Sequence, residues 1–211
     1  MPIKPILFNT EMVRAILDGR KSCTRRICKD ANEYTVPDME FYDADKRTYA
    51  VHNFADLEHT EKLSIGERTC PICPGDILYV RETWCALPVN EAGHMRGHSV
   101  YYYKADGDLR PEGWRGNWRP SIHMPKEAAR IWLKVTDVRA ERLWEISADG
   151  IRNEGLSSAA AHCGDMEIAL KEWEKLWNST IPKKDIDRYG WQANPWVWVI
   201  EFKRCDKPEG V

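Results

Sequence analysis

The stretch 19–26, with the sequence GRKSCTRR, holds residue types that could do chemistry. Lys21 supplies an amine, Ser22 and Thr24 supply hydroxyls, and residues 20–29 include five basic residues and no acidic one. A cluster of like charge repels itself, so it usually faces an anion or water. The stretch is therefore either a solvated basic turn or part of a site for an anionic or polar ligand.

A short helix must position this stretch. Asn9 and Thr10 are good helix N-caps after an apolar run at 6–8, which predicts a strand followed by a helix. The apolar residues that follow share one helical face, and Gly19 is a natural C-terminal stop. Strand positions three apart point to opposite faces, so Lys21 and Thr24 can cooperate only where the backbone turns between them. Thr24 and Arg26 would share one face of the next strand.

Two carboxylates could complete a site. Glu82 lies in an apolar strand predicted over 77–84, where it faces water or is buried with an arginine such as Arg26. Glu154 lies in a short helix that Ser147 could cap and that ends at Gly155.

The run 114–121, with the sequence WRGNWRPS, is rich in tryptophan and arginine. Aromatic and guanidinium planes can stack on a nucleobase, and each such stack contributes roughly 1–3 kcal/mol. The same loop could instead be a lid that closes one end of a barrel. The residues that we predict to bind a ligand are Arg20, Arg25, Arg26, Glu82, Trp84, Arg115, Trp118, Arg119 and His123.

Composition limits the function classes. The chain has 211 residues and a formal net charge of −2, so contact with nucleic acid must come from a local patch and not from a global field. The longest strongly apolar run, 196–200, is too short to span a bilayer, and no signal peptide is recognisable. The seven cysteines are unevenly spaced, which indicates a reduced, cytoplasmic protein with free thiols.

Cys70 and Cys73 have the spacing of half a zinc site, which Cys85, His94 and His98 could complete. A structural zinc site usually shows two recognisable ligand pairs, and the second pair here is not Cys-x-x-Cys. We therefore predict no bound metal and no cofactor.

The rest of the chain predicts several strands and few helices. We expect strands at 77–84, 100–104, 131–138 and 196–202, a helical turn at 125–129, and the best helix at 165–177. Residues 29–69 are polar and lack periodicity, so we interpret them as an insertion with limited structure of its own, disordered in part or forming a flap over a pocket. The prediction is an α+β, mainly β fold: a small β-barrel with peripheral short helices, in a single domain over 1–211.

The basic stretch resembles the ASCH domain. Gly19, Lys21 and Arg26 match its Gly-x-Lys-x-x-x-x-Arg signature. The segments 75–84, 118–125 and 194–200 resemble the longer ASCH proteins of phages and prophages, so the resemblance covers nearly the whole chain outside 29–69. It implies a small PUA-like β-barrel, related to the PUA fold of RNA-binding proteins.

The resemblance also implies a reaction. A short bacterial ASCH amidohydrolase removes the acetyl group of N4-acetylcytidine; its catalytic lysine and threonine match Lys21 and Thr24, and its glutamate aligns best with Glu154, with Glu82 as a rival. Lys21, its neutral form favoured by Arg25 and Arg26, would take the proton of Thr24 Oγ. Thr24 would attack the carbonyl or orient a water, and Glu154 would protonate the exocyclic nitrogen.

Other functions stay open at this point. The chain is about twice as long as that enzyme, so it could be a non-catalytic RNA-binding module of phage or prophage origin. A ribonuclease that uses Lys21 and His123 is a further enzyme option, and a zinc-stabilised interaction protein would need metal on Cys70 and Cys73. The predicted partners are a modified nucleoside or RNA, with no membrane.

Overall fold

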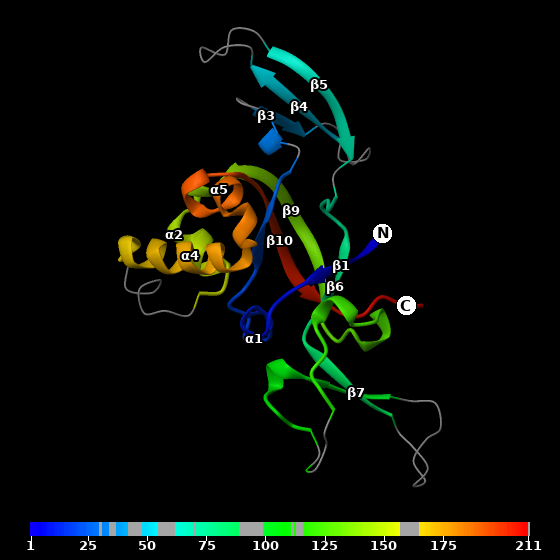
Figure 1. Ribbon diagram of the computed structural model, residues 1–211. Helices are drawn as coiled ribbons and strands as arrows, with labels where there is room; N and C mark the ends of the chain where they lie inside the picture. The colour runs from blue at the N-terminus through cyan, green and yellow to red at the C-terminus, as the bar shows by residue number, and fades with distance from the viewer. Residues whose placement is uncertain are drawn as a thin grey trace.

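A computed structural model places a five-stranded mixed sheet at the centre of the molecule (Figure 1). The structure describes residues 1–29, 31–33, 37–41, 48–54, 62–69, 71–88, 99–110, 112, 116–156 and 165–210. In spatial order the strands are β1 (Ile3–Leu7), β6 (Ile77–Arg81), β9 (Trp132–Arg142), β10 (Trp196–Cys205) and β2 (Cys23–Ile27). β1 pairs with β6 in parallel, and the other neighbouring strands are antiparallel.

Residues 197–200 of β10 are buried on both faces of the central sheet, which explains their continuous apolar run. Val197 and Val199 pack into a core with α2 (Ala148–Asn153) and α4 (Met166–Thr180). Trp198 and Ile200 point into a second core that includes residues of β1, β6 and α1 (Thr10–Leu17). The helices α2, α4 and α5 (Ile186–Tyr189) lie together on one side of the sheet (Figure 1).

The short helices begin and end where the sequence predicts. Asn9 Oδ1 accepts the Met12 backbone N–H at 2.9 Å and caps α1, which ends shortly before Gly19 with its φ of 75°. Ser147 Oγ accepts the Gly150 N–H at 3.0 Å and caps α2. Local capping chemistry is sufficient to set these ends, because it involves residues only three apart.

Seven short 3₁₀ turns connect the longer elements. They are η1 (Ala31–Glu33), η2 (Lys104–Asp106), η3 (Ser121–His123), η4 (Lys126–Ala128), η5 (Leu143–Glu145), η6 (Lys183–Asp185) and η7 (Trp191–Ala193), counted within the described part of the chain. No helix in that part is both long and apolar enough to cross a membrane.

The central sheet is not closed into the barrel that the sequence predicts. β1 and β2 stand at opposite ends of the strand order, and no ladder joins them within the described residues. One side chain spans this gap, because Arg26 Nη2 donates a hydrogen bond to the Leu7 carbonyl oxygen at 2.8 Å. Closure would require main-chain pairing of the first and last strands. The observed class is mixed α and β, rich in strands, with short helices.

The segment 29–69 has more structure than predicted. β3 (Pro37–Phe41), β4 (Thr48–Phe54) and β5 (Lys62–Thr69) form a separate antiparallel sheet in the order β3-β4-β5 (Figure 1). Ladder hydrogen bonds join backbone groups and do not require a strongly apolar sequence. Apolar residues two positions apart, Tyr49 with Val51 and Leu63 with Ile65, give only a weak period-two signal, which is too short to predict these strands.

The strand predicted over 77–84 is broken. β6 ends at Arg81, and β7 (Trp84–Pro88) begins a separate two-stranded sheet with β8 (Ser99–Tyr103). Between them, the fully buried carboxylate of Glu82 pairs with Arg130, so the chain leaves the central sheet at this residue. The other predicted strands and the long helix are confirmed, with ends that differ by a few residues.

Candidate functional site

Lys21 and Glu154 form a buried ion pair beside the central sheet. Lys21 Nζ donates to Glu154 Oε2 at 2.6 Å and to the Glu154 carbonyl oxygen at 3.0 Å. The two side chains are only 0% and 2% exposed. Glu154, and not Glu82, is therefore the carboxylate that pairs with Lys21. Lys21 Nζ is the donor in both hydrogen bonds.

The ends of two helices bring this pair together. The Lys21 N–H donates to the Ala15 carbonyl of α1, and the Ser22 N–H donates to the Asn153 carbonyl at the end of α2. Gly155 makes this approach possible with a φ of 90°, because a Cβ there would lie 2.7 Å from Ala15 Cβ and 2.9 Å from Lys21 Cβ. Contacts as close as these require a glycine at this position, because any other residue would add a Cβ.

Alternating charges continue from this pair across the sheet, an arrangement that we call the charge chain. Arg25 Nη1 lies 3.3 Å from Glu154 Oε1, and Arg25 Nη2 lies 3.3 Å from Glu141 Oε2. Arg139 Nε contacts Glu141 Oε1 at 2.5 Å, and Arg139 Nη1 contacts Glu201 Oε1 at 2.6 Å. The sequence analysis predicted that Arg25 would favour the neutral form of Lys21. In the structure Arg25 instead contacts the carboxylates of Glu154 and Glu141.

Thr24 and Arg26 lie on the opposite face of β2 from Arg25, because side chains alternate along a strand. Thr24 pairs with Ile200 in the ladder and is 1% exposed. Lys21 Nζ and Arg26 Cζ lie 5.6 and 5.3 Å from the centre of the Phe8 ring. Phe8 therefore connects the two basic residues of the signature.

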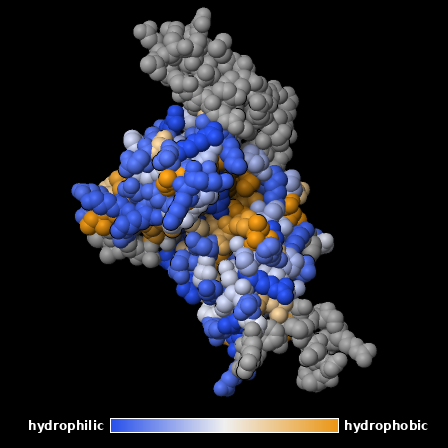
Figure 2. All heavy atoms as spheres, in the orientation of Figure 1, coloured by the Kyte–Doolittle hydropathy of each residue, from blue (hydrophilic) through white to orange (hydrophobic). Residues whose placement is uncertain are grey.

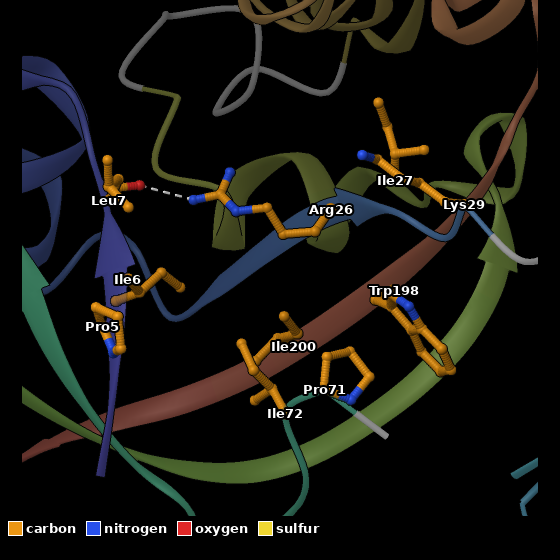
Figure 3. Close-up of a pocket in the computed structure, with 10 residues that line it drawn as sticks. All are labelled: Pro5, Ile6, Leu7, Arg26, Ile27, Lys29, Pro71, Ile72, Trp198 and Ile200. Atoms are coloured by element: carbon orange, nitrogen blue, oxygen red, sulfur yellow. Dashed lines mark hydrogen bonds between the residues drawn. The ribbon is translucent and has the colours of Figure 1, made fainter. Parts of the chain in front are cut away.

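A cavity of about 680 Å³ opens in the gap between β1 and β2, and we call it the sheet-gap pocket (Figure 3). Its lining residues are Pro5, Ile6, Leu7, Arg26, Ile27, Lys29, Pro71, Ile72, Trp198 and Ile200. Hydrophobic residues gather in a hollow at the middle of the face that Figure 2 shows. Burial lowers the pKa of the Arg26 guanidinium, an effect that the charge of Glu154 partly offsets.

The remaining predicted residues divide between two places. Arg20 stays near Glu154, where its Nη1 donates to the Gly155 carbonyl at 2.6 Å. Glu82 and Trp84 belong to the β7–β8 side: Arg130 holds both carboxylate oxygens of Glu82 at 2.9 and 3.0 Å, so its partner is not Arg26.

Arginine–aromatic stacks link the tryptophan–arginine loop to neighbouring residues. Arg119 packs over Trp84 with 5.3 Å between the guanidinium carbon and the ring centre, and Arg110 packs over Trp118 at 4.6 Å. His123 is exposed on η3. The carbonyl oxygens of the residues on either side of it, Ile122 and Met124, accept hydrogen bonds from Arg81. Arg115 lies outside the described residues. The tryptophan–arginine loop therefore forms its own cluster and makes none of the contacts described for Lys21.

Sequence reasoning missed Glu141, Arg139 and Phe8. Glu141 and Arg139 lie on β9, more than a hundred residues from the basic stretch. Their signal is the charged triplet at alternate positions, Asp137, Arg139 and Glu141, because three charges on one face of a strand usually have partners.

The cysteines contribute no described metal site. Among the described residues, no group of three histidine, cysteine, aspartate or glutamate side chains could hold a metal ion, and Cys70 lies outside them. Cys23 lies beside Arg25, and burial, with the charge of Glu154, raises the pKa of its thiol to about 12. Cys23 is therefore a neutral thiol at physiological pH.

Comparison with known proteins finds little. No family model matches this chain, and no curated protein matches it. A solved ASCH domain from Lactobacillus crispatus is similar at 10% identity, over 96% of this chain and 79% of that chain, with a TM-score of 0.39. At this TM-score the likeness does not establish a shared fold, and at this identity nothing about activity follows from it.

Proposed function

We propose that this chain is an ASCH-type protein that binds a nucleoside or RNA and hydrolyses the amide of an N4-acylated cytidine with Lys21, Thr24 and Glu154. The observation that carries the proposal is the 2.6 Å contact between Lys21 Nζ and Glu154 Oε2 in a buried site. Amide hydrolysis needs a base for the nucleophile and an acid for the leaving amine. One proton transfer within this pair supplies both.

The proposed reaction begins when the proton on Lys21 Nζ moves to Glu154 Oε2, which leaves a neutral amine and a carboxylic acid. The amine takes the proton of Thr24 Oγ, or of a water that Thr24 orients, and the oxygen bonds to the acyl carbon. The C–N bond then breaks, and Glu154 gives its proton to the exocyclic nitrogen. Where Thr24 is the nucleophile, water releases the acyl group as a carboxylic acid.

The burial of the three residues favours a second candidate, a binding module without catalysis. Lys21 and Glu154 are almost fully covered, and Thr24 is 1% exposed, so a substrate reaches them only after neighbouring side chains move. In a pure binding module the same ion pair would only join α2 to the start of β2. Such a module predicts salt-sensitive RNA affinity and no turnover.

The decisive experiment is hydrolysis of N4-acetylcytidine, supplied as the free nucleoside, by the wild type and matched variants. Lys21→Ala and Thr24→Val are expected to lower kcat by about 10²–10⁴-fold, while Thr24→Ser keeps the hydroxyl and retains activity. Lys175→Ala, an exposed lysine on α4, is the control and should behave as the wild type. No turnover by the wild type, together with salt-sensitive RNA binding, would select the binding module.

A further inference from the structure

Two cations at the sheet-gap pocket lack a carboxylate partner. Within the described part of the chain, neither Arg26 nor Lys29 forms an ion pair, and Arg26 donates its hydrogen bond to the neutral Leu7 carbonyl. Arg25, one residue earlier, contacts two carboxylates. A guanidinium against an apolar wall is costly unless an anion joins it. The pocket therefore has room and charge for an anionic group.

The rest of the pocket is suited to a flat apolar body. Trp198 supplies an aromatic part of the wall, and Ile6, Ile72 and Ile200 supply most of the aliphatic part (Figure 3). Arg26 extends from β2 across the gap toward Leu7, so the positive charge lies at the β1 side of this wall (Figure 3). A cavity of about 680 Å³ falls within the range of small-molecule sites, roughly 300–1,000 Å³.

We propose that the sheet-gap pocket binds a nucleoside monophosphate, with the base against the Trp198 side and the phosphate at the Arg26 guanidinium on the β1 side. The choice of a nucleobase as the flat body rests on the proposed function. The phosphate is the new element, because a free nucleoside leaves the Arg26 guanidinium hydrogen-bonded only to the neutral Leu7 carbonyl. The ligand is therefore a nucleotide, free or at the end of an RNA strand, in preference to a nucleoside.

This ligand changes the contact that spans the sheet gap. A phosphate accepts charge-assisted hydrogen bonds from a guanidinium, which are stronger than the bond to a neutral carbonyl. The phosphate therefore competes with the Leu7 carbonyl for Arg26. Phe8 lies beneath both Arg26 and Lys21, so releasing Arg26 from Leu7 loosens the packing next to the buried Lys21–Glu154 pair.

The test is calorimetric binding of cytidine 5′-monophosphate, cytidine, ribose 5-phosphate and octanoate to the full chain. The monophosphate is expected to bind at least about tenfold more tightly than each of the other three. Arg26→Gln should remove that preference, Arg26→Lys should keep part of it, and Lys29→Gln, at an exposed position, should lower the affinity by about threefold. Arg204→Gln, an exposed arginine on β10, is the control.

The outcomes separate this inference from the proposed reaction. Equal affinity for cytidine and its monophosphate, octanoate binding as tightly as the monophosphate, or an affinity unchanged in both Arg26→Gln and Lys29→Gln would each overturn the nucleotide pocket, even with amide turnover present. Tight, Arg26-dependent binding of the monophosphate without any turnover would support the pocket and reject the amidohydrolase.

Discussion

At the scale of single residues, Glu154 is the centre of the candidate site. Its carboxylate forms ion pairs with two buried cations: Oε2 contacts Lys21 and Oε1 contacts Arg25. Arg25 is shared in turn with Glu141, whose side chain is 20% exposed. Burying charges is favourable only where every charge keeps its partner, so the network is sensitive to the loss of one member.

We expect Glu154→Gln to lower the free energy of unfolding by about 3–5 kcal/mol, because it leaves Lys21 and Arg25 buried opposite a neutral amide. Glu141→Gln should have a smaller effect, since Glu141 is partly solvated. Glu145→Gln, an exposed neighbour that accepts only the Arg142 N–H, should change it by less than about 0.5 kcal/mol. Urea unfolding measures all three, and equal stability of Glu154→Gln and wild type would show that the pair contributes nothing.

At the scale of elements, β6 and β7 are separate strands, and an ion pair between side chains helps to hold the β7–β8 sheet against the central sheet. Glu82 in the break between β6 and β7 holds Arg130, which also contacts Asp106 at 2.7 Å and packs 4.0 Å from the centre of the Tyr103 ring. Burial raises the pKa of Glu82 above its usual range, and the hydrogen bonds from Arg130 partly oppose this.

The raised pKa predicts a pH dependence of stability. The native state binds more protons at Glu82 than the unfolded state, so this residue's contribution is fully present below its ordinary pKa of about 4.3 and is lost as pH rises through the raised value. The unfolding free energy of the wild type, relative to Glu82→Gln, should therefore fall as pH rises from the ordinary glutamate pKa through the raised pKa of Glu82. Glu127→Gln, exposed on η4, is the control, and a difference that stays flat or grows with pH would contradict the assignment.

At the scale of the whole molecule, the strand order defines what the fold requires. The central sheet runs β1-β6-β9-β10-β2 and takes no strand from the segment that forms β3, β4 and β5. Those three strands pair with one another. The sequence-based prediction of an insertion at 29–69 within a single domain therefore stays a prediction, which a deletion can test.

Replacing residues 34–69 by a flexible linker of about twelve residues tests this organisation. We expect a single cooperative thermal transition with a Tm within about 5 °C of the wild type, because the central ladders are unchanged. Circular dichroism during heating measures it. A variant that unfolds without cooperativity would show that the β3–β5 sheet is part of the central core.

The sequence by itself determined the features that depend on neighbours in the chain. Asn9, Ser147 and Asp165 cap helices through contacts three residues away, and the apolar run at 196–202 specifies a buried strand. The basic stretch was evident from the run of basic residues at 20–29 without any acidic residue. The weak alternation of apolar residues within 29–69 was too short to specify strands.

Only the tertiary structure decided which charges meet. Lys21 and Glu154 are 133 residues apart, and Arg25 and Glu141 are 116 apart, so their contacts follow from the register of β2, β10 and β9 and from the close approach at Gly155. The open gap between β1 and β2, with its pocket, depends in the same way on the order of all five strands. Local propensity cannot specify such pairings, because they are set by the packing of distant segments into one sheet.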